Sequence, residues 1–408
     1  GEKLANLKDL HDNPSSGLPQ FGMDLTWTFY RKDSDNTGQI GTGDKVYLYG
    51  GMRMGGDNYY ALDATSLTAP KLLFAVDGGT GKYANMGQTW SQPVVTTVKI
   101  SGANKKVLVF GGGYDPRHET ANEIFTGNDK GNQVYMLDAF TGDLLWFASG
   151  NSSDGADKYV SEMKYSVASG IQAVDVDGNG VTDALYFGDL GGQVFRVDFD
   201  KTSTTNATVA KRVRQIAKLG QTESGTIPNQ RRFYEPPKAA LFTDTAGTKF
   251  ATIALGSGYR SHPLNTVTQD RFFVLFDYDL PRADLGTADD ASLKTIITTP
   301  DMAVLDMAST TVKESGVNVT NKRGWYVDLP ASGEKSLASG LIFQQKLLFT
   351  TYTPKKSAVS NCSPITGVTG TYTFCMPYGN LCVDGATSYF KDNVTLGLGG
   401  EPQLLVIP

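Results

Sequence analysis

One short pattern recurs along the chain: an aromatic-rich segment that ends in aspartate. It reads NYYALD, QVYMLD, QVFRVD and FFVLFD, with final residues Asp63, Asp138, Asp198 and Asp277. An apolar segment that ends at or near glycine precedes each copy, and another β-prone segment precedes that one. A further segment, such as KLLFAV or LLWFAS, often follows. Short aromatic and β-branched segments bounded by turn formers predict strands. The chain is therefore predicted to repeat a unit of four antiparallel strands.

Four antiparallel strands per repeat are typical of a β-propeller blade. The 46 glycines, 20 phenylalanines and 19 tyrosines also favour many short strands joined by tight turns. A β-sandwich or two small β domains would not repeat one strand order with the same terminal residue. We predict an all-β fold, a modified quinoprotein-like β-propeller with loop insertions and about five to seven four-stranded blades.

The same pattern gives the expected domain organisation. Residues 1–23 are predicted to be an N-terminal linker or extension of a mature fragment, and residues 24–408 the propeller. An insertion is expected around residues 280–325, and a cysteine-containing loop around residues 355–390. This loop holds Cys362, Cys375 and Cys382. One disulfide with one free thiol is predicted, with three reduced thiols as the alternative and the pairing left open.

Composition and motifs weigh against several classes of function. The net charge is −5 and the charges are scattered, so no basic surface for nucleic acid is expected. No apolar run reaches the roughly 18 residues of a membrane helix. The three histidines are His11, His118 and His262, and neither a nucleophile elbow nor a phosphate loop is present. We predict that the chain is not an enzyme.

The segment LDAFTGDLLW, residues 137–146, predicts how neighbouring blades meet. Thr141 and Gly142 favour a tight turn between two strands, after which Trp146 returns toward a neighbouring element. This pattern resembles the blade-docking motif of quinoprotein-type propellers. Trp146 is expected to pack between blades and not to contact a ligand.

The segment VDVDGNGVTDA carries the clearest chemistry in the sequence. Its polar residues Asp175, Asp177 and Asn179 hold the first, third and fifth positions of a calcium loop, and Gly180 holds the sixth, where the chain must turn sharply. The carbonyl of Val181 and the carboxylate of Asp183 are available as the next ligands. Calcium prefers such oxygen ligands, and three close carboxylates repel one another without a cation. We predict a Ca²⁺ site at these five residues.

The residues beside this loop define its setting. Short β-prone segments flank it, so a strand–loop–strand site between two blade strands is expected instead of a helix pair. Tyr186 holds the twelfth position, where a bidentate glutamate is usual. The expected affinity is therefore modest, in a range of roughly 10⁻⁶ to 10⁻³ M. The alternative is a solvated polar turn.

A second acidic segment, KDSDNTG, is a weaker calcium candidate. Asp33, Asp35 and Thr37 hold its first, third and fifth positions, and Gly38 holds the sixth. Gly41 stands at the ninth position without a ligand, and Asp44 at the twelfth could compensate. An ordinary polar turn is the alternative.

Several segments together resemble one known family. They are DKVYLYGGMRMGGDNYYALD, TWSQPVV, VLVFGGGYDP, VYMLDAFTGDLLW, VDVDGNGVTDALYFGDLGGQVFRVD and GWYVDLPASGEKSLASGLIFQQKLLFTTYTP, in this order. They are similar to the C-terminal propeller of the PilC/PilY family of type IV pilus tip-associated proteins. The resemblance runs from about Asp24 to Pro408.

The resemblance implies a function outside the cell. Such proteins are exported by Gram-negative bacteria and lie at the pilus tip, the outer membrane or the cell surface. They support pilus assembly, oppose retraction, and support adhesion and twitching motility. The resemblance implies calcium at Asp175, Asp177, Asn179, Val181 and Asp183, and minor pilins as partners. It identifies no host receptor, and no RGD tripeptide is present.

Two other functions are kept as alternatives. A generic extracellular propeller that binds a ligand or glycan could use loop aromatics such as Tyr114, Phe233 or Tyr259. A quinone-dependent dehydrogenase would share the DxxTGxxxW pattern. Such enzymes often carry adjacent cysteines, and this chain has none.

Overall fold

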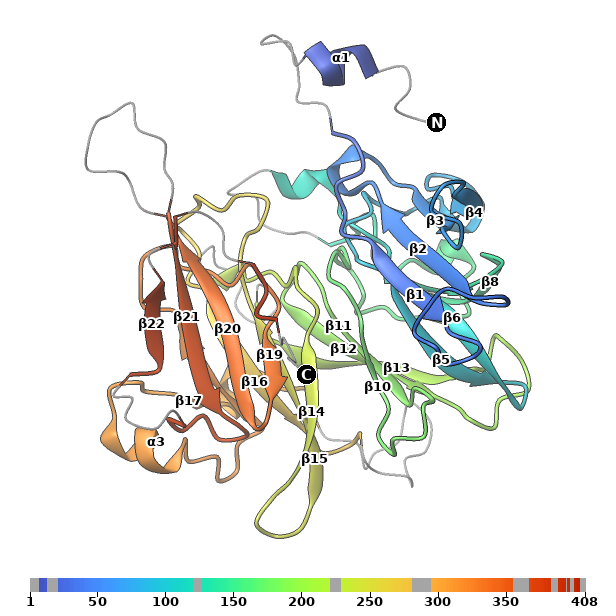
Figure 1. Ribbon diagram of the computed structural model, residues 1–408. Helices are drawn as coiled ribbons and strands as arrows, with labels where there is room; N and C mark the ends of the chain where they lie inside the picture. The colour runs from blue at the N-terminus through green and yellow to red at the C-terminus, as the bar shows by residue number, and fades with distance from the viewer. Residues whose placement is uncertain are drawn as a thin grey trace.

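The fold of the 408-residue chain is that of a computed structural model. The structure describes residues 7–12, 21–119, 127–220, 229–280, 295–354, 367–382, 388–393, 395–396 and 400–403. Within these ranges, the strands form five sheets that follow one another along the chain (Figure 1). The fold is thus all-β and propeller-like, and the five sheets are consistent with the predicted blades.

In each sheet the first four main strands are antiparallel neighbours in chain order. The first two sheets contain β1 (Thr28–Lys32), β2 (Lys45–Gly51), β3 (Tyr59–Asp63) and β4 (Lys71–Val76), then β5 (Val94–Ile100), β6 (Ala103–Gly111), β7 (Gln133–Asp138) and β8 (Leu144–Ser149). The third contains β10 (Gln172–Val174), β11 (Ala184–Gly188), β12 (Gln193–Phe199) and β13 (Ala210–Lys218).

The last two sheets carry the longest connections. They contain β14 (Lys238–Thr243), β15 (Lys249–Gly256), β16 (Arg271–Asp277) and β18 (Gly324–Asp328), then β19 (Leu341–Phe343), β20 (Lys346–Thr353), β21 (Val368–Cys375) and β22 (Phe390–Asn393). Three short strands extend the sheets, namely β9 (Lys158–Tyr159) on β8, β17 (Ala303–Val304) on β18, and β23 (Thr395–Leu396) on β21.

Helical structure among the described residues is short. It comprises α1 (Leu7–Asp12), α3 (Thr310–Ser315) and 3-10 turns at Arg53–Gly55, Gly81–Tyr83, Pro116–Glu119, Ser152–Asp154 and Thr299–Asp301. β17 and α3 lie between β16 and β18, within the predicted insertion. In the part of the chain that the structure describes, no helix is long and apolar enough to cross a membrane.

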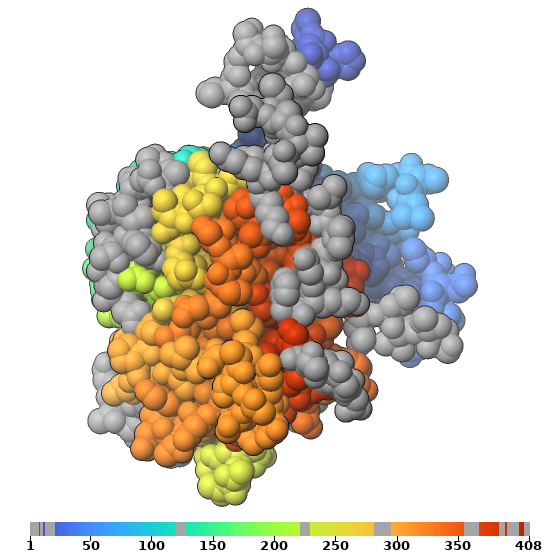
Figure 2. Space-filling model, turned by 90° about the vertical axis from the view of Figure 1, so that its left-hand side faces the viewer, coloured from blue at the N-terminus to red at the C-terminus, as the bar shows by residue number. Residues whose placement is uncertain are grey.

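The innermost strands neighbour one another in the order β1, β5, β10, β14 and β19, so the sheets stand side by side around an axis (Figure 1). The turn between β14 and β15 projects from one edge of the molecule (Figures 1 and 2). Loops between first and second strands therefore gather at one end of the axis, and residues that lead into the first strands gather at the other.

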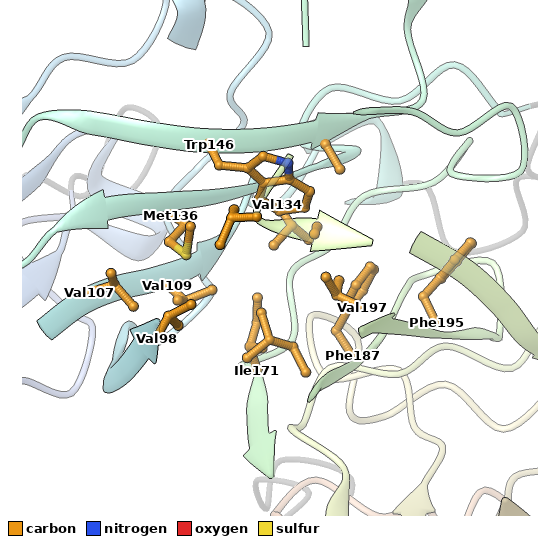
Figure 3. Packing of buried hydrophobic residues seen from close by; sticks show 14 of the residues in the cluster. Val98, Val107, Val109, Val134, Met136, Trp146, Ile171, Phe187, Phe195 and Val197 are labelled. Atoms are coloured by element: carbon orange, nitrogen blue, oxygen red, sulfur yellow. The ribbon is translucent and has the colours of Figure 1, made fainter. Parts of the chain in front are cut away.

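Buried apolar side chains form a separate core between each pair of consecutive sheets. Between the second and third sheets, Trp146 and Met136 face Phe187 and Val197 (Figure 3). Trp146 is fully buried, which confirms that it packs between blades. Since alternate residues of a strand point to opposite faces, each inner sheet contributes one apolar face to each of two cores.

The recurring aspartate ends the third strand of a blade for a local reason. Asp138 Oδ1 accepts the backbone N–H groups of Phe140 and Thr141, and Gly142 follows with a φ of +79°. Asp63 Oδ1 likewise accepts the N–H of Thr65. Such aspartate turns reverse the chain, so this residue terminates the strand and positions the next one.

In the first and third blades, only the end of the β-prone segment before the apolar strand forms the first strand. These segments are MDLTWTF, residues 23–29, and SVASGIQAV, residues 166–174, whereas β1 begins at Thr28 and β10 at Gln172. The preceding residues instead cross to neighbouring blades: Ser91 Oγ donates to the carbonyl of Ser169 at 2.7 Å, and Ser339 Oγ to that of Pro236 at 3.0 Å. Serine hydroxyls can satisfy such carbonyls in place of a strand ladder.

Candidate calcium site

The loop of residues 175–183 joins β10 to β11, the first two strands of the third blade. Val174 and Ala184 are partners in the antiparallel ladder, so the loop closes a hairpin. Both flanking segments are strands, as predicted. The hairpin brings the two ends of the acidic segment together and fixes where their side chains project.

The three carboxylates of this loop converge. Asp175, Asp177 and Asp183 each offer an oxygen, and these oxygens all lie within 4.8 Å of one another. Two oxygens that bind one calcium ion at about 2.4 Å are separated by no more than about 4.8 Å. The donor set, hard oxygens from three carboxylates, therefore fits calcium in both chemistry and spacing.

Backbone N–H groups order the loop and leave particular oxygens available. Asp175 Oδ2 accepts the N–H of Gly180 at 2.6 Å, and its Oδ1 accepts that of Gly178 at 2.8 Å. Asp177 Oδ1 accepts the N–H of Asn179, and Asp183 Oδ2 accepts that of Val176. The loop backbone therefore uses neither Asp177 Oδ2 nor Asp183 Oδ1.

The other predicted ligands belong to the same turn. Asn179 Oδ1 accepts the N–H of Val181 at 2.8 Å, and the Val181 residue is buried. Gly180 has a φ of +81°, a conformation that residues with a Cβ adopt at a cost. The glycine at the sixth position is thus required by the backbone, as predicted, and the calcium ligands themselves stay a prediction.

A lysine from another loop contacts the cluster, and no pattern in the sequence predicts this contact. Lys201, in the turn after β12, places Nζ 2.5 Å from Asp183 Oδ1 and 3.2 Å from Asp177 Oδ2. The hydrogen bond from Lys201 lowers the pKa of Asp177 below its ordinary value. Partial desolvation lowers the pKa of Lys201, but the bonds to Asp183 and Asp177 outweigh it and leave this pKa raised.

The loop is also tied to the second blade. Thr182 donates its N–H to the carbonyl of Thr97 in β5 at 2.8 Å, and its hydroxyl lies 2.5 Å from that of Thr96. Nearby, Ser101 at the β5–β6 turn donates its N–H to the carbonyl of Ser203 at 3.0 Å. Any change in the acidic loop therefore acts at the junction of two blades.

The second acidic segment forms a cluster as well. Oxygens of Asp33, Asp35 and Asp44 lie within 4.8 Å of one another, in the loop between β1 and β2. Thr37 donates its hydroxyl to Asp35 Oδ1 at 2.9 Å, so it lies beside the cluster. Backbone N–H groups of Gly41 and Ser34 lower the pKa of Asp44. Asp44 thus supplies the carboxylate that the ninth position lacks.

A cavity of about 360 Å³ opens where the leads into the first strands meet around the axis. Arg53, Arg260 and Trp90 line it, and the guanidinium of Arg53 lies 4.5 Å above the Trp90 ring. Gly170 also lines the cavity just before β10, whereas the acidic loop starts beyond the other end of β10. A quinone with a neighbouring calcium ion would require the loop and the cavity to form one site. Because they lie at opposite ends of β10, they do not.

Other residues singled out in the sequence have structural roles. Tyr114, Phe233 and Tyr259 are buried, which supports local packing of these three aromatics over the alternative that they contact a ligand. Their rings fill spaces around the axis and between blades. His118 is buried and its Nε2 lies 2.7 Å from Asp129 Oδ2. Cys375 and Cys382 have free thiols, and Cys362 lies outside the described residues.

Comparison with known proteins finds a relative that is described as a type IV pilus factor. No protein-family model matches the chain. A curated Xylella fastidiosa protein described as a type IV pilus biogenesis factor PilY1 homolog is 24% identical over 335 residues, which cover 78% of this chain and 20% of that protein. The chain thus spans about a fifth of the length of this relative.

Comparison with solved structures shows which proteins have a similar fold. The C-terminal domain of PilY1 from Pseudomonas aeruginosa superposes with a TM-score of 0.56 at 19% identity, over 83% of this chain and 68% of that chain. A quinohemoprotein alcohol dehydrogenase from Comamonas testosteroni reaches a TM-score of only 0.33 at 9% identity, over 86% of this chain and 42% of that chain, too low to support an argument. Both comparisons confirm the resemblance drawn from the motifs: the chain is similar in sequence to a PilY1 homolog and in fold to the C-terminal domain of PilY1.

Proposed function

We propose that this chain is the calcium-binding propeller of a type IV pilus biogenesis factor and tip adhesin. In this role the protein is exported to the pilus tip or cell surface, contacts minor pilins, supports assembly and opposes retraction. Adhesion and twitching motility depend on the same protein. The sequence similarity to a type IV pilus biogenesis factor homolog supports a role in pilus biogenesis. The function proposed is not enzymatic.

The observation that carries the calcium part of this proposal is the convergence of Asp175, Asp177 and Asp183 in one hairpin loop. When bound, calcium would supply two positive charges that cancel most of the repulsion among three carboxylates. Asp177 Oδ2 and Asp183 Oδ1 would hold the ion, since the backbone uses their partner oxygens. Asp175 would join through oxygens that also accept N–H groups.

The effect of the loop on a pilus contact follows from its attachments. Thr182 links the loop to β5 through its N–H and its hydroxyl, so an ordered loop holds the second and third blades together at this edge. A surface that spans two blades keeps its shape only while the blades keep their relative position. We therefore expect calcium to stabilise the surface that meets the pilus partner.

The test uses Asp175→Ala and Asp183→Ala in the full-length protein, with Asp244→Ala as the matched control. Asp244 begins the β14–β15 turn, where its carboxylate accepts the N–H groups of Ala246 and Thr248 and belongs to neither of the two acidic clusters described above. Calorimetry should show calcium binding at this loop lost in the first two variants and kept in the control. Pilus number and twitching should fall with it.

The outcomes separate the two parts of the proposal. Wild-type calcium affinity in both loop variants would reject the calcium site. Lost affinity with normal piliation and twitching would leave the ion a structural role and reject its role in pilus function. A defect of equal size in the Asp244 control would show that piliation responds to general damage to the propeller.

We also propose the cluster of Asp33, Asp35 and Asp44 as a second calcium site. The specific support is its construction, which matches that of the first. Asp33 Oδ2 accepts the N–H of Gly38, as Asp175 does from its sixth-position glycine, and Asp44 Oδ1 accepts the N–H of Ser34 at 2.7 Å. Calorimetry of the wild type should fit two ions per chain, and Asp44→Asn should reduce the count to one. One ion in both proteins would reject this second site.

A further inference from the structure

Among the residues that the structure describes, one basic side chain forms an ion pair with the acidic loop of the third blade from outside it. Lys201 stands in the turn after β12, and its Nζ is 2.5 Å from Asp183 Oδ1 and 3.2 Å from Asp177 Oδ2. Its side chain is 35% exposed, so it reaches the carboxylates from the solvent side. The contact joins two loops of one blade that are separate in sequence.

The two oxygens that Lys201 contacts are those that the loop backbone leaves available. Asp177 directs its other oxygen to the N–H of Asn179, and Asp183 directs its other oxygen to the N–H of Val176. A calcium ion that binds both carboxylates would need the same two oxygens. An ammonium group and a calcium ion cannot share them, because like charges at a few ångströms repel strongly.

Resting on the proposed calcium function, we propose that Lys201 is a tethered competitor of calcium that sets the affinity of the loop. Its ammonium offsets part of the repulsion among the three carboxylates and keeps the loop ordered. Calcium binding then requires Lys201 to leave Asp177 and Asp183. Because the lysine is partly exposed and on a separate turn, its side chain can swing into solvent while the hairpin stays in place.

The exchange of Lys201 for calcium also affects the contact with the second blade. The turn that carries Lys201 continues to Ser203 and Thr204, whose carbonyls accept the N–H and the hydroxyl of Ser101 in the second blade. Release of the lysine therefore removes one of the links that hold this turn against the acidic loop, while Ser203 and Thr204 keep the turn on the second blade. Affinity for calcium and order at the blade junction are set by one residue.

The first experiment measures calcium affinity by calorimetry for wild type and Lys201→Met, in the full-length protein at one fixed pH and salt concentration. Exposed ion pairs contribute modestly, so the expected gain in affinity is about two- to tenfold. Lys211→Met is the control, because it removes the same charge from β13 and should change affinity less. Equal affinity in wild type and Lys201→Met, or weaker binding in the variant, would overturn the proposal.

The second experiment follows Lys201 itself in the wild-type protein. Acetylation by an amine-reactive reagent, read by mass spectrometry, should increase at Lys201 as calcium is added, with the midpoint at the dissociation constant, and stay constant at Lys211. Binding without any change at Lys201 would overturn the proposal and leave the calcium site intact. No calcium binding by wild type or by Lys201→Met would reject the proposed calcium function as well, so the two failures are distinguishable.

Discussion

Arg196 is the residue whose replacement tests the fold most sharply. It is fully buried at the junction of the third and fourth blades, and its Nη1 lies 2.6 Å from Asp277 Oδ2. Its Nε lies 2.7 Å from Asp198 Oδ1. Asp277 also accepts the hydroxyl of Tyr186 at 2.8 Å. One arginine therefore joins the terminal aspartates of two blades, which the sequence presents only as separate repeats of one pattern.

Arg196→Met should destabilise the protein by about 3–5 kcal/mol, because it leaves a buried carboxylate uncompensated. The control is Arg271→Met, where the pair with Asp328 joins two adjacent strands of one blade and Asp328 is 46% exposed. A pair so exposed contributes about 1 kcal/mol or less. Urea unfolding monitored by tryptophan fluorescence and circular dichroism measures both. The double variant Arg196→Met with Asp277→Asn should recover much of the loss, since it removes the unpaired charge.

The direction in which the stability of wild type and Arg196→Met changes with pH tests the same reasoning. Burial raises the pKa of Asp277, but Arg196 and the hydrogen bonds outweigh it and leave this pKa below its ordinary value. In wild type its contribution is therefore present above about pH 3.9 and is lost as the pH falls through the lowered pKa. In Arg196→Met burial dominates and raises this pKa, so the deficit of the variant should shrink as the pH falls from 7 toward 4. A deficit below about 1 kcal/mol at pH 7, or one that grows on acidification, would refute the argument.

Three further predictions concern the core and the acidic loop. Trp146→Ala should cost about 3–5 kcal/mol in urea unfolding because it empties the core between the second and third blades, whereas the partly exposed Phe140→Ala should cost far less. Gly180→Ala meets no atom within 4 Å but requires a φ of +81°, so it should weaken calcium binding about tenfold in calorimetry; Gly247→Ala, with a φ of +83° in the β14–β15 turn, should leave binding unchanged. Calcium at 100 times the dissociation constant of this loop should stabilise the wild type by about 2.7 kcal/mol through this site, and chelation should reverse this. In thermal unfolding, Asp175→Ala should lose this contribution and keep only that of the proposed second site.

The blades could be predicted because their signals are local. Alternating apolar residues, the glycine that ends the second strand and the aspartate turn after the third all lie within a few positions of one another. The starts of the first strands could not, because the leading residues bond to other blades, as Ser91 does to Ser169. A hydroxyl whose partner lies on another blade leaves no periodic trace in the sequence.

In the acidic loop, too, some features could be predicted from the sequence and others could not. Asp175, Asp177 and Asp183 could be predicted to converge, because one hairpin holds all three and Gly180 makes the turn. Lys201 could not, because the β11–β12 hairpin separates it from the loop and a lone lysine after a strand is an ordinary surface residue. The partner of the strand-ending Asp277 was equally hidden, since Arg196 belongs to a different blade.

The two acidic clusters show which feature of such a loop sets its ligands. Asp183 holds the ninth position and Asp44 the twelfth, yet each directly precedes the second strand of its blade and accepts the N–H of the residue after the first aspartate. The closing carboxylate is therefore fixed by the end of the hairpin and not by a count from the first ligand. In the shorter loop the twelfth position falls inside β11, where Tyr186 is buried and donates to Asp277. A ligand missing from that position is a consequence of the hairpin, so both loops retain three carboxylates despite their different lengths.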